Sequence, residues 1–354
     1  MNILWDFRLF SYGYSNRGVG VYTKALASAY LKDYPAKIFV LGDKECVSEK
    51  FKSNQFTWID YSPCGWKLDL IKIPSIIRKH KIDIFHYWIA LGPLHQIGLG
   101  LYHNCTTVAT IYDMGVENWD IPFLKSVKRS WYYKVQIRIT SKINTIICIS
   151  EATSADLVQK VPSFQDKIKV IYKPVVSTLP EKREKARDPY FITLGGSRHK
   201  NVARVVKAFD LFRKNNTDYQ LIILGCIDRL DEDLEQVPPG VIFENSMVNY
   251  DYHLKNSSGL IFCSLYEGLG LPPIEGMSYG CPLLVSDIPS VHETCDNAAI
   301  FVDPMNLEHI AEGMHQLARN TTVWSSRSYD GALEYGLKTR NAAKELNNIY
   351  QSVR

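Results

Sequence analysis

Short apolar runs alternate with helical patterns along the whole chain, and this alternation limits the possible folds more than any other feature. The runs lack the every-second-residue polarity of half-exposed strands, so both faces of each expected strand are covered. Strand, helix and strand in succession predict parallel sheets of the doubly wound α/β type. We expect strands within residues 2–7, 37–42, 82–87, 106–112 and 144–150, and within 190–195, 219–225, 240–245, 259–264 and 281–286.

The two sets of runs indicate two domains. The chain has 354 residues, more than one hydrophobic core usually serves. Between the sets, residues 177–190 are charged, flanked by prolines and without apolar periodicity. We interpret 177–189 as a linker between domains 1–176 and 190–335; a surface loop inside one domain is the alternative.

The bulk properties are those of a globular protein. The net charge of +4 gives no argument for a nucleic-acid partner, and we expect none. The eight cysteines form no C-x-x-C pair, which favours a reducing compartment. Asp6 and Arg8 stand where a signal peptide needs an apolar core, and no apolar run has the length of a membrane span. We therefore expect a cytoplasmic protein.

Two glutamates flank a glycine-proline turn in the stretch YEGLGLPPIEG, residues 266–276. A proline pair can open a helix, so we expect Glu267 in a strand-to-helix loop and Glu275 in the first helical turn. Gly268 and Gly270 let a ligand approach the backbone N–H groups, and the helix N-terminus adds further N–H donors and a positive dipole end.

This turn suits an anion, but its carboxylates would repel one. Carboxylates accept hydrogen bonds from sugar hydroxyls, so the ligand that satisfies both parts is a diphosphate with a sugar at each end. The alternative is that Glu275 only complements the helix dipole and Glu267 is a surface residue.

A second glycine turn, LGGSRHKN at 194–201, follows the first strand of the second domain. Gly196 permits a tight turn, Asn201 is a candidate helix N-cap, and an apolar stripe at helical spacing follows. Arg198, His199 and Lys200 would lie above the strand ends, where open α/β sheets bind ligands. Two cations could neutralise a diphosphate leaving group without a metal; a solvated basic turn is the alternative.

The N-terminal half offers weaker candidates. Gly18 and Gly20 precede an expected helix, but a dinucleotide-binding fingerprint would need a third glycine where Thr23 stands. Asp113 ends an expected strand, where it could accept a sugar hydroxyl or make a turn. Ser150 or Thr153 could cap the next helix.

Two charged stretches leave alternatives open. Residues 125–143 hold six basic and no acidic residues among aromatics. This pattern fits contact with anionic lipid, or a helix packed through its aromatics with a solvated basic face. The acidic triplet at 231–233 fits a metal pattern but is typical of a solvated helix start. We expect neither a metal nor a cofactor.

The stretch SLYEGLGLPPIEGMSYGCPLLVSDIPSVHE, residues 264–293, resembles the signature of retaining glycosyltransferases of the GT-B fold, family four (group 1). The second glycine turn resembles the phosphate loop of that family. RGVGVYTKAL, TIYDM and CISEATSADL resemble its N-terminal landmarks. The resemblance implies two Rossmann-like domains facing an interdomain cleft, with residues 336–354 crossing back to the first domain.

The resemblance also implies an activity. Such enzymes move a sugar from a nucleotide-diphosphate sugar, here leaning to GDP-mannose, to a glycan or lipid-linked acceptor with retention, in surface polysaccharide synthesis. Lys200 matches the phosphate-binding lysine. His199 stands where many relatives have arginine, and we expect Arg198 to substitute. Tyr112 stands where relatives often have histidine, so only Asp113 is carried over.

The expected location is the cytoplasm, with residues 125–143 as a peripheral contact to the inner face of the membrane. A sugar-nucleotide epimerase, a phosphorylase of the same fold and a non-catalytic sugar-nucleotide-binding subunit remain alternatives. The expected catalytic residues are Lys200, Arg198, Glu267 and Asp113, and the expected sugar-nucleotide-binding residues are Gly18, Gly20, Gly196, Gly268, Leu269, Gly270, Leu271 and Glu275.

Overall fold

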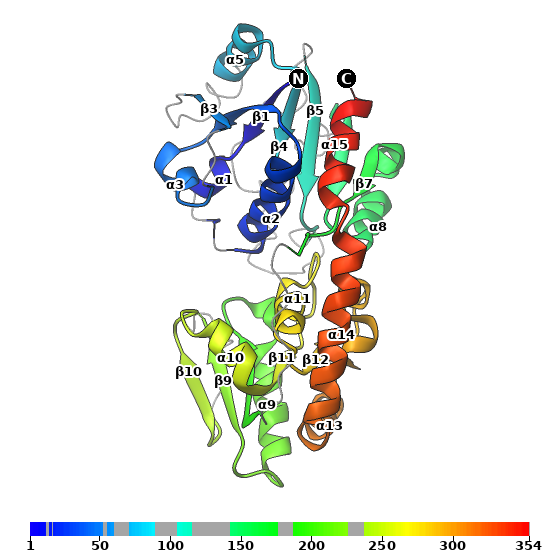
Figure 1. Cartoon of the computed structure of the whole chain (residues 1–354). Coiled ribbons are helices and arrows are strands. Elements are labelled where there is room, and N and C mark those ends of the chain that lie inside the picture. Colours follow the sequence, from blue (N-terminus) through cyan, green and yellow to red (C-terminus); the bar gives the residue numbers. More distant parts are fainter. Residues whose placement is uncertain are drawn as a thin grey trace, which may run out of the picture. The chain divides into compact units, whose positions relative to one another are not determined.

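The chain folds into two α/β units, each built on one parallel sheet (Figure 1). Unit 1 comprises Met1–Val176 and Thr339–Arg354, and unit 2 comprises Ser177–Lys338. The structure is a computed structural model, and it describes residues 1–11, 14–15, 17–51, 55–59, 71–88, 105–114, 142–175, 187–225 and 237–353.

The sheet of unit 1 has seven strands in the order β3-β2-β1-β4-β5-β6-β7, all parallel to their neighbours. The order turns back on itself at β1, as doubly wound sheets do. The strands are β1 (Asn2–Asp6), β2 (Lys37–Leu41), β3 (Phe56–Ile59), β4 (Ile84–Tyr87), β5 (Thr106–Ile111), β6 (Thr145–Cys148) and β7 (Ile168–Val170).

Helices cover both faces of this sheet, which explains why its central strands are almost entirely buried and mostly apolar. Alternate side chains of one strand serve opposite faces, so Leu4 joins the core under α5 and α8 while Trp5 faces the other side. Within the residues that the structure describes, the helices of unit 1 are α1 (Arg8–Ser11), α2 (Gly18–Asp33), α3 (Lys44–Ser48), α5 (Ile73–His80), α8 (Glu151–Lys160), the 3₁₀ turn η3 (Pro162–Lys167) and α15 (Ala342–Ser352).

The C-terminal helix α15 belongs to unit 1 and packs against α2 (Figure 1). Its Tyr350 hydroxyl accepts a hydrogen bond from Nε1 of Trp5 at 3.0 Å and lies 2.6 Å from Nδ1 of His86. The other ring nitrogen of His86 lies 2.9 Å from the hydroxyl of Thr110. Burial lowers the pKa of His86 to about 3, so this histidine is neutral in the fold.

The sheet of unit 2 has six parallel strands in the order β10-β9-β8-β11-β12-β13. Its order turns back between β8 and β11, the position where ligands bind in open α/β sheets. The strands are β8 (Asp188–Leu194), β9 (Gln220–Leu224), β10 (Val241–Glu244), β11 (Ser257–Phe262), β12 (Leu283–Ser286) and β13 (Ile300–Val302).

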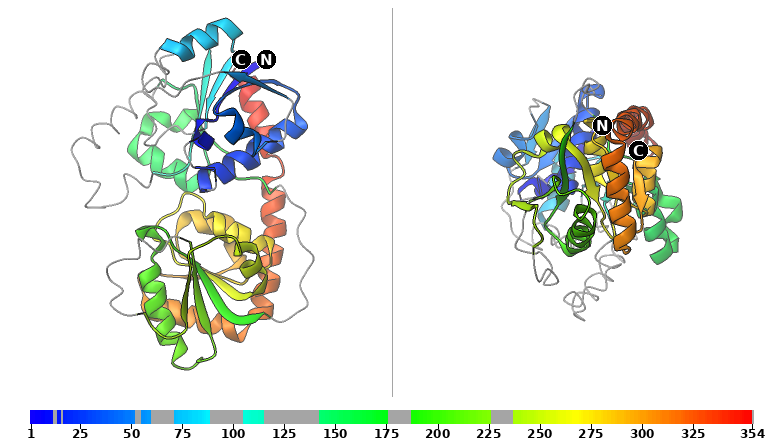
Figure 2. Two further views of the ribbon diagram at one scale, coloured as in Figure 1. Left: turned by 90° about the vertical axis from the view of Figure 1, so that its left-hand side faces the viewer. Right: turned by 90° about the horizontal axis from the view of Figure 1, so that it is seen from below.

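The unit 2 sheet is also covered on both faces (Figure 2). Ile261 and Leu284 share a core with α9 and α13, whereas the neighbouring side chains Leu260 and Leu283 meet Gly276 of α11. The helices are η4 (Arg198–Lys200), α9 (Val202–Arg213), α10 (Tyr250–Asn256), α11 (Leu271–Ser278), α12 (Pro289–Cys295), η5 (Asp296–Ala298), α13 (Leu307–Arg319) and α14 (Thr321–Thr339).

Arg187, near the end of the expected linker, is hydrogen-bonded to the main chain of unit 2. Its guanidinium donates to the carbonyl oxygens of Leu254 at 2.9 Å and Gly280 at 2.6 Å, and to three others. Strand β8 begins at the next residue, Asp188, which lies inside the expected linker. A charged run therefore ends in a side chain that satisfies main-chain carbonyls of unit 2.

All ten expected strands are present, and three more were not predicted: β3, β7 and β13. Each is the edge of its sheet. Among the described helices, none is both long enough and apolar enough to cross a membrane. The predictions for 125–141, for the triplet at 231–233 and for most of the linker lie outside the described residues.

Candidate functional site

The candidate site of unit 2 is built from two loops at the carboxyl ends of neighbouring strands. One loop follows β8 and contains η4, and the other follows β11 and leads into α11. The main-chain N–H of Leu265 donates to the carbonyl oxygen of His199 at 2.8 Å. This bond joins the two glycine-rich stretches, although 66 positions separate these residues in the chain numbering (265 − 199).

An ion pair joins the two loops at their side chains. The Nζ atom of Lys200 lies 2.6 Å from Oε1 of Glu267, and the two side chains are 18% and 14% exposed. The ammonium also lies 5.0 Å from the centre of the Phe262 ring, a cation–π distance. The structure therefore brings together two of the predicted site residues, as a largely covered pair of opposite charge.

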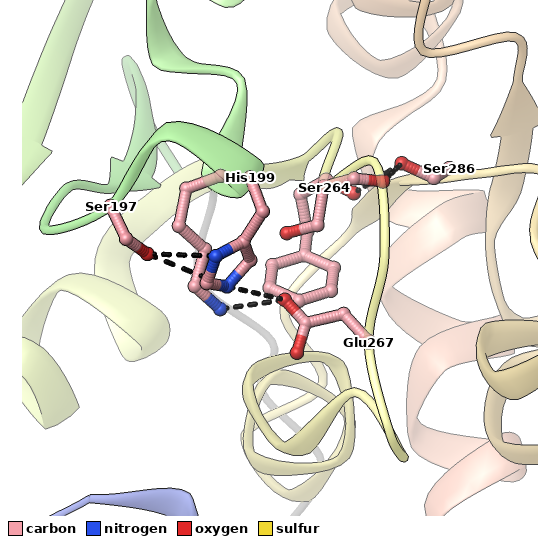
Figure 3. Close-up of polar contacts among 7 residues, drawn as sticks. Ser197, His199, Ser264, Glu267 and Ser286 are labelled. Carbon is pink, nitrogen blue, oxygen red and sulfur yellow. Dashed lines mark hydrogen bonds and ion pairs between the residues drawn. The ribbon is translucent and has the colours of Figure 1, made fainter. Parts of the chain in front are cut away.

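His199 lies beside Glu267, as Figure 3 shows. Its Nδ1 is 3.0 Å from the hydroxyl of Ser197, and its Nε2 is 3.9 Å from the Oε1 of Glu267 that Lys200 contacts. Burial lowers the pKa of His199, the carboxylate of Glu267 works in the opposite direction, and the charge of Lys200 lowers it further. The balance favours a neutral imidazole at pH 7.

Asn201 occupies the position before α9, but the prediction that its side chain caps the helix was wrong. Its backbone is left-handed, with φ of 59°, and its side chain accepts no hydrogen bond from the helix N–H groups. Instead, Nδ2 donates to the carbonyl oxygens of Cys263 at 3.0 Å and Pro304 at 2.7 Å. The amide thus holds the β8 loop against the end of β11.

The glycine turn ahead of these residues leaves open space. Gly196 has φ of 116°, and a Cβ built on it would meet no atom within 4 Å. Arg198, two residues later, is exposed, so it lies on the outer side of the turn. A ligand can therefore approach the backbone at Gly196 while cationic groups stand nearby in the chain.

The loop after β11 turns into α11 through Gly270, whose φ is 78°. The helix begins at Leu271, so Glu275 lies in its second turn, not in the first as predicted. The prolines at 272 and 273 carry no N–H, which leaves two donors among the first four helical positions. The start of this helix therefore offers fewer N–H donors than a helix without prolines would.

Glu275 lies close to a buried tyrosine that the sequence did not single out. The hydroxyl of Tyr250, at the start of α10, is buried. Its pKa is raised well above the usual value, first by burial and then by the carboxylate of Glu275. Burial and the neighbouring carboxylate therefore keep the phenol of Tyr250 protonated.

The end of β11 is also fixed from its other neighbour, β12. The hydroxyl of Ser286 donates to the carbonyl oxygen of Ser264 at 2.6 Å, a contact drawn in Figure 3. Both serines are buried. The backbone just before Glu267 is therefore held by a side chain from the next strand.

The predicted residues of unit 1 lie at the start of α2 and after β5. Helix α2 begins at Gly18, so Gly18 and Gly20 are inside its first turn and do not precede it as expected. A Cβ on Gly20 would lie 2.4 Å from the carbonyl oxygen of Tyr14, which leaves no room for a side chain. Asp113 follows β5 and is exposed.

Tyr112, next to Asp113, is held by two helices. Its hydroxyl lies 2.6 Å from Oγ1 of Thr23 in α2, and its carbonyl oxygen accepts from Oγ1 of Thr153 in α8 at 3.3 Å. The predicted capping role of Ser150 is confirmed, since its Oγ accepts from the N–H of Thr153 at 3.0 Å. These bonds fix the backbone that carries Asp113.

The structure thus brings Lys200 and Glu267 into contact. It places Gly268, Leu269 and Gly270 in the same loop as Glu267 and Leu271 at the start of α11, whereas Gly18, Gly20 and Asp113 belong to unit 1. Sequence reasoning missed Ser197 and Tyr250, and it left the role of His199 open. Within the described ranges, no group of three histidine, cysteine or acidic side chains is arranged to hold a metal ion.

Two family models match the chain, one for each half. The model described as Glycosyltransferase Family 4 matches residues 16–178, and the one described as Glycosyl transferases group 1 matches residues 177–330.

Relatives and solved structures agree with these models. The O-antigen chain mannosyltransferase RfbU of Salmonella typhimurium is 26% identical over 243 residues, which cover 62% of this chain and 66% of RfbU, slightly under two thirds of its length. The lipopolysaccharide 1,6-galactosyltransferase of the same organism is 28% identical over 159 residues, or 41% of this chain and 43% of that protein. The structure of Anabaena HepE in complex with UDP and glucose superimposes with a TM-score of 0.75 at 13% identity, covering 99% of this chain and 100% of HepE.

The two models together span residues 16–330, and the two parallel-sheet units match a solved structure over nearly their full length. The chain therefore belongs to the glycosyltransferases of family four (group 1) and has the GT-B fold.

Proposed function

We propose that this glycosyltransferase moves a hexose from a nucleotide-diphosphate sugar to a glycan or lipid-linked acceptor, with retention at the anomeric carbon. The observation that carries the proposal is the ion pair of Lys200 and Glu267 at the carboxyl edge of the unit 2 sheet. A cation and a carboxylate side by side suit a ligand that carries phosphates and sugar hydroxyls together.

In the proposed reaction, Lys200 contacts the diphosphate. Negative charge grows on the leaving phosphate as the bond to the sugar breaks, and a fixed ammonium stabilises that charge without a metal. The N–H groups of Gly268 and Gly270 would contribute on the same side, and open space at Gly196 lets the phosphates approach the other loop. Arg198 is the proposed second cation, on the outer side of the turn.

The two glutamates would bind hydroxyls, one those of the ribose and the other those of the transferred sugar. Glu275 suits such a role because carboxylate oxygens accept hydrogen bonds from hydroxyls. Glu267 would then exchange its contact with Lys200 for contacts to the sugar.

Unit 1 is proposed to hold the acceptor, with Asp113 accepting a hydroxyl and the backbone at Gly18 and Gly20 approaching the diphosphate. The leaving phosphate oxygen would help to deprotonate the acceptor hydroxyl. The protein then contributes positioning and charge stabilisation, so it needs no pair of carboxylates acting as acid and base. The proposed domain limits are 1–176 and 190–335, with 336–354 returning to the first domain.

GDP-mannose is the proposed sugar nucleotide, and a cell-surface polysaccharide is the proposed product. The names of RfbU and of the lipopolysaccharide galactosyltransferase support the product, and the name of RfbU supports the sugar. The HepE structure with UDP and glucose supports a sugar nucleotide in general and keeps UDP-sugars as competitors. The proposed location is the cytoplasmic face of the membrane, contacted through residues 125–143.

A thermal-shift panel of UDP-, GDP-, dTDP- and ADP-sugars tests the proposal, because a ligand that binds the folded state raises the melting temperature by mass action. We expect one base to stand out. Release of free nucleotide diphosphate only in the presence of an acceptor would then favour transfer over epimerisation. If no sugar nucleotide raises the melting temperature and none is turned over, the proposed function is wrong.

A further inference from the structure

The charged side chains around Glu267 do not balance the negative charge of the ligand proposed above. Lys200 and Glu267 neutralise each other at 2.6 Å, and His199 is 3.9 Å from the same carboxylate oxygen. A diphosphate esterified at both ends brings two negative charges. If it attracts the ammonium of Lys200, it leaves Glu267 without a cation and adds anions next to a carboxylate.

We propose that His199 is a further residue of this site: its imidazole takes up a proton from solvent when the diphosphate binds, and the imidazolium then pairs with Glu267 while Lys200 turns to the phosphate. This inference rests on the proposed function and adds a proton to its binding step. The proton goes to the histidine, and no bond of the ligand is broken.

The geometry allows His199 to replace Lys200 without a large movement. Its Nε2 already faces Oε1 of Glu267, and Nδ1 lies at hydrogen-bond distance from the hydroxyl of Ser197, which can accept a hydrogen bond from an imidazolium N–H. The carbonyl of His199 is bonded to the N–H of Leu265, so the backbone is fixed against the loop that carries Glu267. Only the imidazole and the lysine side chain need to rotate.

The charged and titratable groups around the imidazole determine the direction of the effect. Within unit 2 these are Lys200 and Arg198 beside it on η4, and Glu267 from the loop after β11. Without ligand, burial and Lys200 hold the pKa of His199 below its usual value, so the ring is neutral at pH 7. Bound phosphates and a Glu267 that has lost its lysine both favour the charged ring, so the pKa rises on binding.

A rise in pKa on binding means that binding tightens as the pH falls. The dissociation constant should decrease from pH 8 to pH 6, by up to about tenfold per pH unit where a full proton is taken up. The phosphates of a sugar nucleotide stay ionised in this range, because both are esterified. The proton can therefore be assigned to the protein.

Titration calorimetry of the full chain with GDP-mannose and with UDP-glucose, in buffers of different ionisation enthalpy at pH 7, measures this proton. For wild type we expect an uptake between zero and one proton per bound ligand. His199→Gln should bind with no uptake and a flat pH dependence, and His199→Arg should bind with no uptake and no loss of affinity at pH 8. His315→Gln is the matched control, since His315 lies on α13 against Phe212, and should behave as wild type.

Equal proton uptake by wild type and His199→Gln would overturn the inference while leaving the proposed function intact, because the ligand still binds. Absence of binding by every sugar nucleotide would refute the proposed function, and this inference with it. If the wild-type protein binds a sugar nucleotide tightly but takes up no proton, the imidazole stays uncharged and the inference is wrong.

Discussion

Replacing Lys200 by methionine separates the two effects that its ammonium has in this protein. The side chain stabilises Glu267 in the folded state, and in the proposed reaction it stabilises the leaving phosphate. Methionine keeps an apolar side chain of similar length and removes the charge, together with the cation–π contact to Phe262. The two effects differ in size, so stability and turnover should respond unequally.

The stability effect follows from the exposure of the pair. A hydrogen bond between charged groups contributes about 1.5–3 kcal/mol when it is well covered. Lys200 and Glu267 are 18% and 14% exposed, and water can partly solvate the remaining carboxylate. We therefore expect a loss of about 1–2 kcal/mol of unfolding free energy. For a domain of the length of unit 2 this is a fall in Tm of roughly 2–8 °C, at about 2–4 °C per kcal/mol.

The effect on turnover should be larger. Removing one group that stabilises charge in a transition state typically lowers kcat by about 10²–10³, or about 3–4 kcal/mol. We expect that loss in kcat/KM for Lys200→Met. Lys207→Met, on the exposed side of α9, is the matched control and should change unfolding free energy by less than about 0.5 kcal/mol.

Calorimetry or denaturant unfolding measures the unfolding free energy, and release of nucleotide diphosphate in the presence of acceptor measures kcat/KM. If Lys200→Met loses stability but keeps kcat/KM within about threefold of wild type, the lysine acts only in the fold. The assignment of the phosphate to Lys200 would then be refuted.

Other contacts give three further predictions. Glu275→Ala should weaken binding of the sugar nucleotide by at least about tenfold in calorimetry, because the carboxylate proposed to accept a hydrogen bond from a sugar hydroxyl is lost. Unchanged affinity would show that Glu275 is not part of the site. Asn201→Gly keeps the left-handed backbone but loses the side-chain hydrogen bonds to Cys263, Pro304 and Arg204, so it should destabilise unit 2 by about 1–3 kcal/mol, and Asn201→Ala should cost more in the same urea titration. His86 is neutral when folded but charges when unfolded, so stability should fall as the pH drops from about 6.5 toward 3, by up to about 1.4 kcal/mol per pH unit, and His86→Gln should flatten that slope.

The candidate site was predictable where residues stand close together in the sequence. The glutamates and glycines of residues 266–276 and the basic residues of 198–200 follow strands that were themselves predicted, and the carboxyl ends of parallel strands share one edge of a sheet. Position in the chain could not show that Lys200 and Glu267 bond to each other, nor that Tyr250 lies beside Glu275. Both contacts depend on how two separate loops pack.

Asn201 and Arg187 show why local rules failed. An asparagine before a helix is a favoured cap, but the left-handed backbone at Asn201 directs its amide to the carbonyl oxygens of Cys263 and Pro304. An arginine at the end of a charged run is usually solvated, but the fold surrounds Arg187 with main-chain carbonyls. In both cases the deciding partners are distant in sequence.

The sequence alone determined the two parallel sheets, because a strand covered by helices on both faces is apolar at most positions and is recognisable without its neighbours. It did not reveal β3, β7 or β13, which form sheet edges, are short and are only partly buried. Their pairing comes from the neighbouring strand and not from their own composition. Tertiary structure alone decided which side chains form an ion pair at the site, since an ion pair between two loops exists only after the strands beneath them have aligned.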